Sequence, residues 1–224
     1  MGERRALIPY HFGTRWDVIP NREGAWDVIE GGTLADKLKR VVGRRLVVSG
    51  DCMAAIPAHR AHLGLVWYDA HGDFHTLGTT TTGSTGGMPL AMLCGLGDYS
   101  LLRACGVSPA SSVVFHVGGS EFDPGERERM IGEGVHVTRR VGRWEHGPRV
   151  HLHVDTDVVR TADLPSSLHP APNGLPADEF WRDMDVLMPH TEVLSVKTYD
   201  PRLDHDGRGE ALVLELIRRF NDAR

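Results

Sequence analysis

Seven short apolar segments, separated by segments of helical periodicity, constrain the fold of this chain more than any other feature. The predicted strands are residues 6–10, 45–48, 65–69, 112–117, 135–138, 150–155 and 192–197. The predicted helices are residues 33–42, 52–62, 89–96, 124–131, 177–188 and 209–221. Alternation of strands and helices indicates a mainly parallel sheet with helices on both faces. The sequence therefore predicts a three-layer α/β/α fold, with residues 1–224 in a single domain.

The composition limits the classes of partner. The chain has 224 residues and a formal net charge of −5, which argues against nucleic acid as the main partner. No apolar run approaches the ~18–20 residues that cross a bilayer. The three cysteines (Cys52, Cys94 and Cys105) form no C-x-x-C pair and leave one unmatched, which predicts a reducing, cytoplasmic setting. We expect a small molecule as the partner.

The segment GLVWYDAHGDFHT (64–76) begins as an apolar strand and ends in ionisable side chains. Asp69, His71, Asp73 and His75 stand at every second position. Since side chains of a strand alternate between two faces, this spacing predicts that all four point to the same side.

Two other predicted strands end in similar groups. Strand 150–155 ends in Asp155, with Asp157 two residues on, and strand 45–48 is followed by Gly-Asp-Cys at 50–52. In parallel sheets, ligands bind at the carboxyl ends of the strands. Several carboxylates gathered there repel one another unless a divalent cation is present. Carboxylate oxygens with one imidazole suit Mn²⁺, with Fe²⁺, Co²⁺ or Zn²⁺ as alternatives.

These motifs resemble those of the ureohydrolases, the family of binuclear manganese hydrolases that includes arginases and agmatinases. DAHGD (69–73) is similar to the family's D-A-H-x-D signature, and DTD (155–157) to the end of its S-x-D-x-D motif. SGDC (49–52) falls where the family has G-G-D-H, and EFDPGE (121–126) resembles an acidic turn near the substrate amine. The resemblance implies an arginase-like fold and hydrolysis of a guanidino-type C–N bond.

The resemblance also implies a ligand set for two metal ions. Asp69 and Asp155 would bridge the metals, and a hydroxide held between them would attack the planar amidine carbon. Asp73 would also orient that hydroxide. The implied metal ligands are Cys52, Asp69, His71, Asp73, Asp155 and Asp157.

Two residues of the metal centre depart from the family pattern. Cys52 stands where arginases have a histidine ligand, so it is either a soft ligand or a buried neutral thiol, and the number of bound metals is one or two. The family's proton-shuttle histidine aligns with Gly86. We therefore assign His75 as a replacement acid or base, the alternative being that it only bonds the threonine-rich loop.

The substrate-binding positions also differ. Thr198 stands where the family has the glutamate that binds the guanidinium, which disfavours arginine itself. The resemblance places Thr82 and Ser84 in the substrate loop. It places Asp123 near the substrate amine, unless Asp123 instead caps a helix that opens at Pro124.

The sequence therefore predicts a manganese-dependent hydrolase of linear C–N bonds that acts on an arginine derivative such as N-hydroxyarginine. A catalytically degenerate ureohydrolase that binds a metal or a small ligand is the alternative, and a single-metal deacylase on the same fold is a third reading. A homo-oligomer is consistent with the resemblance.

Overall fold

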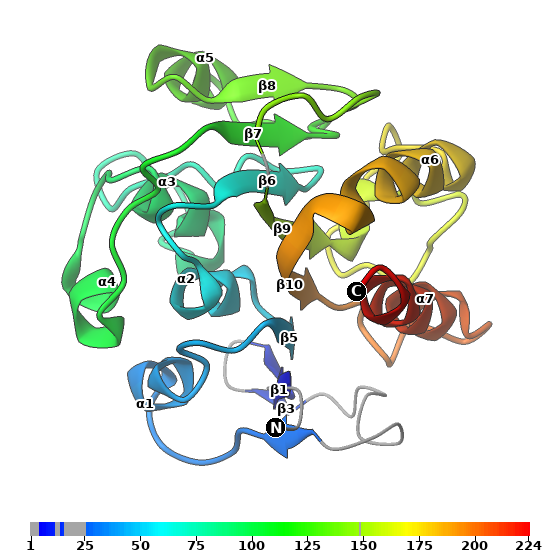
Figure 1. Cartoon of the computed structure of the whole chain (residues 1–224), viewed down its shortest axis with the longest axis horizontal. Coiled ribbons are helices and arrows are strands. Elements are labelled where there is room, and N and C mark those ends of the chain that lie inside the picture. The colour runs from blue at the N-terminus through cyan, green and yellow to red at the C-terminus, as the bar shows by residue number, and fades with distance from the viewer. Residues whose placement is uncertain (1–4, 12–13, 16–25, 148) are drawn as a thin grey trace.

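A parallel sheet forms the centre of the molecule (Figure 1). The structure is a computed structural model, and it describes residues 5–11, 14–15, 26–147 and 149–224. The sheet has eight strands in the order β4-β1-β5-β10-β9-β6-β7-β8. In chain order these are β1 (Arg5–Ile8), β4 (Asp27–Val28), β5 (Leu46–Ser49), β6 (Gly64–Tyr68), β7 (Val114–Val117), β8 (His136–Thr138), β9 (Val150–Asp155) and β10 (Thr191–Lys197). A separate antiparallel pair joins β2 (Tyr10–His11) to β3 (Thr14–Arg15).

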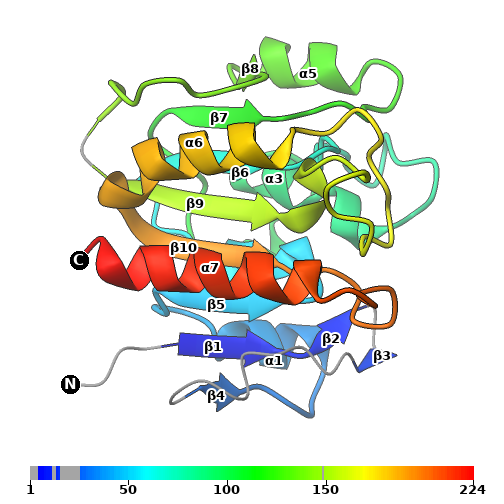
Figure 2. The ribbon, with the colours of Figure 1, turned by 90° about the vertical axis from the view of Figure 1, so that its right-hand side faces the viewer.

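Helices cover both faces of the sheet (Figures 1 and 2). One face packs against α6 (Ala177–Leu187) and α7 (Arg208–Asp222). The other packs against α1 (Leu34–Lys39), α2 (Ala55–Ala58), α3 (Pro89–Leu93), α4 (Ser100–Cys105) and α5 (Glu126–Gly132). Among the described residues, no helix is both long enough and apolar enough to cross a membrane. The predicted three-layer α/β/α architecture is confirmed.

The central strands are apolar throughout because both of their faces are covered. In β6, Val66 and Tyr68 contribute to the core under α6 and α7, while Leu65 and Trp67 contribute to the core on the opposite face. A strand buried on both faces lacks the polar alternation of a half-exposed one. Because these strands are parallel, their carboxyl ends lie at the same edge of the sheet. The acidic strand ends therefore share that edge.

The predicted strands and helices are all present, with shifted ends. The predicted helix 52–62 is shorter and composite: a 3₁₀ turn, η2 (Cys52–Ala54), leads into α2, which ends at Ala58 because His59 is extended. The predicted strand 6–10 ends at Ile8. Sequence analysis missed α4 and the short strands β2, β3 and β4.

Candidate active site

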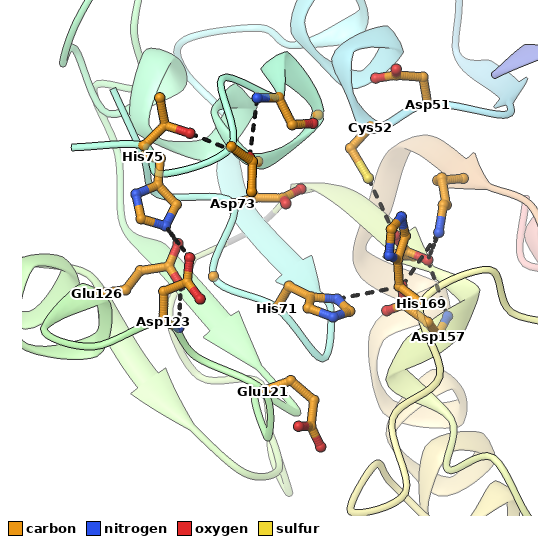
Figure 3. A pocket seen from close by; sticks show the side chains of 18 of the residues that line it. Asp51, Cys52, His71, Asp73, His75, Glu121, Asp123, Glu126, Asp157 and His169 are labelled. Atoms are coloured by element: carbon orange, nitrogen blue, oxygen red, sulfur yellow. Dashed lines mark hydrogen bonds and ion pairs between the residues drawn. The ribbon is translucent and has the colours of Figure 1, made fainter. Parts of the chain in front are cut away.

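A cavity of about 350 Å³ opens at the carboxyl ends of β5, β6, β9 and β10 (Figure 3). Five of the six predicted metal ligands line it, and the sixth, Asp69, lies directly beside them, buried. The predicted residues Thr82, Ser84, His75 and Asp123 line it too, whereas Thr198 does not. The lining residues that sequence analysis did not assign include Asp51, Glu121, Glu126, His169 and Lys197.

A local turn fixes the first acidic residue at each of three strand ends. One carboxylate oxygen accepts a hydrogen bond from the backbone N–H two residues further on, a turn that aspartate forms readily. The bonds are Asp51 Oδ1 to Met53 N (2.8 Å), Asp69 Oδ1 to His71 N (2.8 Å) and Asp155 Oδ1 to Asp157 N (3.0 Å). These turns hold the side chains of Asp51, Asp69 and Asp155 at the strand ends.

His75 departs from the common direction predicted for Asp69, His71, Asp73 and His75, and strand alternation is not what brings the other three together. Strand β6 ends at Tyr68, so strand alternation does not extend along these residues. Asp73 has a φ of +50°, the one positive value among the described non-glycine residues. This left-handed conformation redirects the chain, and His75 then points toward Asp123 and Glu126, away from Cys52 and Asp157 (Figure 3).

Asp69, His71 and Asp157 form one side of the centre, which we call the His71 side. His71 Nδ1 lies 3.5 Å from Asp69 Oδ1 and 3.5 Å from Asp157 Oδ2. Burial alone would lower the pKa of His71, but Asp157 and Asp69 raise that pKa to about 12. One donor atom from each residue lies within 4.8 Å of the others, close enough to hold one metal ion.

Cys52, Asp73 and Asp155 form the other side, the Cys52 side. The Cys52 thiol is buried and donates to Asp155 Oδ2 at 3.3 Å. Burial, reinforced by the nearby carboxylates, raises the pKa of this thiol well above its usual range. The Oδ2 atom of Asp73 is buried and has no hydrogen-bond partner among the described residues.

Lys197 is a cation that sequence analysis missed. It ends β10 directly beside Asp155 of β9, and its side chain is 6% exposed. Its Nζ lies 3.0 Å from Asp155 Oδ1 and 3.3 Å from Asp157 Oδ2. The pKa of Lys197 is raised, because both carboxylates outweigh the effect of burial. A lysine at the end of an apolar strand is the feature of the sequence that could have indicated it. The strand order is needed to show which carboxylates the lysine contacts.

Beneath the Cys52 side, a buried row of polar side chains, the histidine row, leads away from the cavity. His59 Nδ1 lies 3.3 Å from His151 Nδ1, and Ser195 Oγ lies 2.8 Å from His151 Nε2 and 2.9 Å from His153 Nδ1. The ring of His153 lies tilted against Trp67, 3.7 Å between ring centroids, and its Nε2 has no partner among the described residues. One donor atom each of Cys52, Asp69 and His153 also lies within 4.8 Å of the others.

The charges on the cavity floor favour a divalent cation. Burial, followed by repulsion from neighbouring carboxylates, raises the pKa values of Asp69, Asp73 and Asp155. Their oxygens, an imidazole and an unpartnered carboxylate oxygen at Asp73 form a donor set that a cation such as Mn²⁺ would satisfy. The residues present therefore fit a metal, more fully on the His71 side than on the Cys52 side.

The rim of the cavity holds the other titratable groups. His75 Nε2 lies 2.9 Å from Asp123 Oδ2, and His75 Nδ1 lies 3.2 Å from Thr79 Oγ1, so both alternatives for His75 have a contact. Asp123 does not cap a helix with its side chain, because α5 begins at Glu126 after Gly125. Glu126 is buried and accepts from the backbone N–H groups of Phe74 (3.0 Å) and Asp123 (3.1 Å).

Thr82, Ser84 and Glu121 complete the rim, whereas Thr198 lies outside it. Ser84 N donates to Thr82 Oγ1 at 3.2 Å in the loop above the cavity. Glu121 reaches the cavity from the opposite wall, and its Oε1 is buried without a partner among the described residues. Thr198 follows Lys197 but is buried, and its hydroxyl contacts no described polar group.

Comparison with known proteins gives consistent results. Residues 33–221 match the sequence profile of the arginase family. The N(omega)-hydroxy-L-arginine amidinohydrolase of Streptomyces lavendulae is 32% identical over 221 residues, which cover 93% of this chain and 77% of that protein. The arginase of Bacillus subtilis is 30% identical over 213 residues, 82% of this chain and 72% of that protein. The native structure of Bacillus caldovelox arginase superposes with a TM-score of 0.83 at 23% identity and covers 98% of both chains.

Proposed function

The chain belongs to the arginase family, and we propose that it is a metal-dependent hydrolase that cleaves a C–N bond in a linear guanidino or amidine compound. The observation that carries the proposal is the convergence of three buried carboxylates and one imidazole on the lining of a single cavity, with the fourth carboxylate, Asp69, buried directly beside them. A buried cluster of this kind is costly without a cation. Retention of all four carboxylates supports a catalytic metal centre.

The proposed cofactor is Mn²⁺, held by Asp69, His71 and Asp157 on one side and by the Cys52 side where a second ion binds. When bound, the metal supplies a water of lowered pKa as the nucleophile and stabilises the charge that develops in the transition state.

The protein's own groups then position the reacting atoms. Asp73, whose Oδ2 is unpartnered, accepts a hydrogen bond from the attacking water and orients it toward the amidine carbon. The water oxygen adds to that carbon and passes a proton to Asp73, which returns it to replace the proton spent on the amine. The C–N bond to the alkyl amine breaks, and the amine leaves with a proton. His75, paired with Asp123, is the group we propose to deliver that proton.

Charge on the rim supports a cationic substrate. Glu121 and Asp123 both face the cavity, and the unpartnered Oε1 of Glu121 is suited to accept from a guanidinium or an amine. Thr82 and Ser84 present hydroxyl groups from the loop. The substrate we propose is an arginine derivative such as N-hydroxyarginine, which the name of the Streptomyces lavendulae relative supports. A direct contact from Thr198 stays a prediction.

A second function, binding of a metal or small ligand without turnover, is favoured by two observations on the Cys52 side. The thiol stands in place of an imidazole, and Lys197 contacts two of the proposed ligands. This alternative predicts metal and ligand binding with no product.

The test is product release by protein loaded with Mn²⁺ and incubated with arginine, N-hydroxyarginine and agmatine. We expect hydroxyurea from N-hydroxyarginine, with a smaller rate of urea release from arginine. The Asp157→Asn variant is the matched control, since it removes one carboxylate and should abolish the reaction. Bound metal with no turnover of any of these compounds would favour the binding protein instead.

A further inference from the structure

Lys197 occupies the part of the centre where a second metal would need free carboxylate oxygens. Its position is set by the sheet: β10 pairs with β9 so that Lys197 is in register with Asp155, and with β5 so that it is in register with Ser49. Because the residue is buried between two neighbouring strands, its ammonium group stays at the floor of the cavity.

Asp155 is already satisfied by groups of the protein on both oxygens. Oδ1 accepts from Asp157 N at 3.0 Å and from Lys197 Nζ at 3.0 Å. Oδ2 accepts from the Cys52 thiol at 3.3 Å. To bridge two metals, Asp155 would have to give up its side-chain contacts with Lys197 and Cys52, and a cation on either oxygen would lie near a buried ammonium group of like charge.

The His71 side is less obstructed, although Lys197 Nζ also lies 3.3 Å from Asp157 Oδ2, and Asp69 accepts hydrogen bonds from His71 N and Trp67 Nε1. Among the described residues, Asp157 Oδ1 accepts a single long hydrogen bond, 3.4 Å from Ala70 N, and the His71 side chain is 34% exposed toward the cavity. Asp69, His71 and Asp157 already offer donor atoms within 4.8 Å of one another. A cation can therefore enter from the cavity without displacing Lys197.

We propose that Lys197 takes the place of the second metal, so that this chain binds a single divalent ion at Asp69, His71 and Asp157. The inference rests on the proposed function, since it specifies the metal content of the same site. Lys197 contributes the positive charge that holds Asp155 and the remote oxygen of Asp157 in place, and the bound ion contributes the rest.

The experiment counts metal ions without using activity. Purified protein is loaded with Mn²⁺, desalted and measured by elemental analysis and by electron paramagnetic resonance. We expect one Mn²⁺ per wild-type chain, with the spectrum of an isolated ion. In the Lys197→Met variant we expect a second, weaker ion, and in Lys197→Met combined with Cys52→His we expect two ions with an exchange-coupled spectrum. The second dissociation constant should fall at least tenfold relative to wild type.

Lys39→Met is the matched control, because Lys39 is an exposed lysine on α1, remote from the cavity in sequence and on another element. It should keep one ion per chain. If Lys197→Met does not fold, Lys197→Gln keeps a hydrogen-bond donor without the charge, and the wild-type count decides in any case.

Two coupled ions in the wild-type chain would overturn the inference and leave the proposed function standing. No ion at all would overturn both. The role of Lys197 would be overturned if wild type binds one ion and every Lys197 variant, including the combination with Cys52→His, also binds one.

Discussion

The His71 side and the Cys52 side of the centre share one sheet edge but offer a cation opposite surroundings. On the His71 side, the donor atoms converge around a partly exposed imidazole. On the Cys52 side, the thiol is buried, Asp155 is bonded through both oxygens, and Lys197 adds a positive charge. Similar D-x-H and D-x-D spacings therefore do not ensure equivalent metal sites, because the neighbouring strands decide which oxygens stay available.

The largest effect should follow from breaking the His71 side. His71→Ala removes the imidazole of this side, and we expect loss of tightly bound Mn²⁺ and a fall in kcat/KM of more than about 100-fold. This fall exceeds the loss expected from mutating a residue that only hydrogen-bonds to a metal ligand. Cys52→Ala is the paired variant on the other side and should keep its metal. Metal analysis and steady-state kinetics check both variants. Loss of the metal in Cys52→Ala but not in His71→Ala would show that the metal binds on the Cys52 side instead.

A smaller effect should come from Asp73, which acts from the Cys52 side. Asp73→Asn preserves shape, and asparagine tolerates the positive φ of this position. We expect the metal and the folded stability to be retained while kcat falls about 100-fold, the range for a lost proton-accepting group. Metal content, thermal melting and kcat are measured on the same sample. Loss of the metal would instead place Asp73 among the essential ligands.

His75→Gln tests whether the rim supplies the proton for a centre whose Cys52 side lacks a histidine ligand. Because His75 pairs with Asp123, we expect kcat to fall at least about 10-fold and one limb of its pH profile to disappear. Thr79→Val removes the hydrogen bond to the other ring nitrogen, together with the bond that Thr79 Oγ1 accepts from Thr76 N, and should have a much smaller effect. An unchanged rate and pH profile in His75→Gln would leave His75 with the structural role alone.

The two sides also differ in how far the sequence predicts them. Apolar strands and the spacing of Asp69, His71 and Asp157 are local features, so the sheet, its helices and the acidic strand ends could be predicted. The contact of Lys197 depends on β10 lying between β5 and β9, which no local pattern specifies.

The predicted alignment of His75 with the other three residues failed for a similar reason. The alternation rule holds only while the chain is a strand, and β6 ends at Tyr68. The positive φ of Asp73 then turns the chain, and aspartate is not a residue whose presence alone signals that conformation.

The smallest effect concerns the histidine row that underlies the Cys52 side, and it should appear in stability rather than in catalysis. Burial lowers the pKa of His59 to about 4, so the folded protein holds this imidazole neutral, whereas the unfolded chain protonates it near pH 6.5. The titration of His59 therefore does not lower the free energy of unfolding above pH 6.5. It lowers that free energy progressively as pH falls toward 4.

Replacement by glutamine removes this titration while every carboxylate of the centre stays in place. The free energy of unfolding of His59→Gln, relative to wild type, should thus improve between pH 6.5 and pH 4 by up to about 3 kcal/mol. Denaturant unfolding of metal-free protein at several pH values measures the difference. His71 gives the opposite sign, since a raised pKa stabilises the fold at low pH and loses that effect as pH rises. If the free energies of unfolding of the two proteins differ by a constant amount across this pH range, the fold does not hold His59 neutral, and the prediction is wrong.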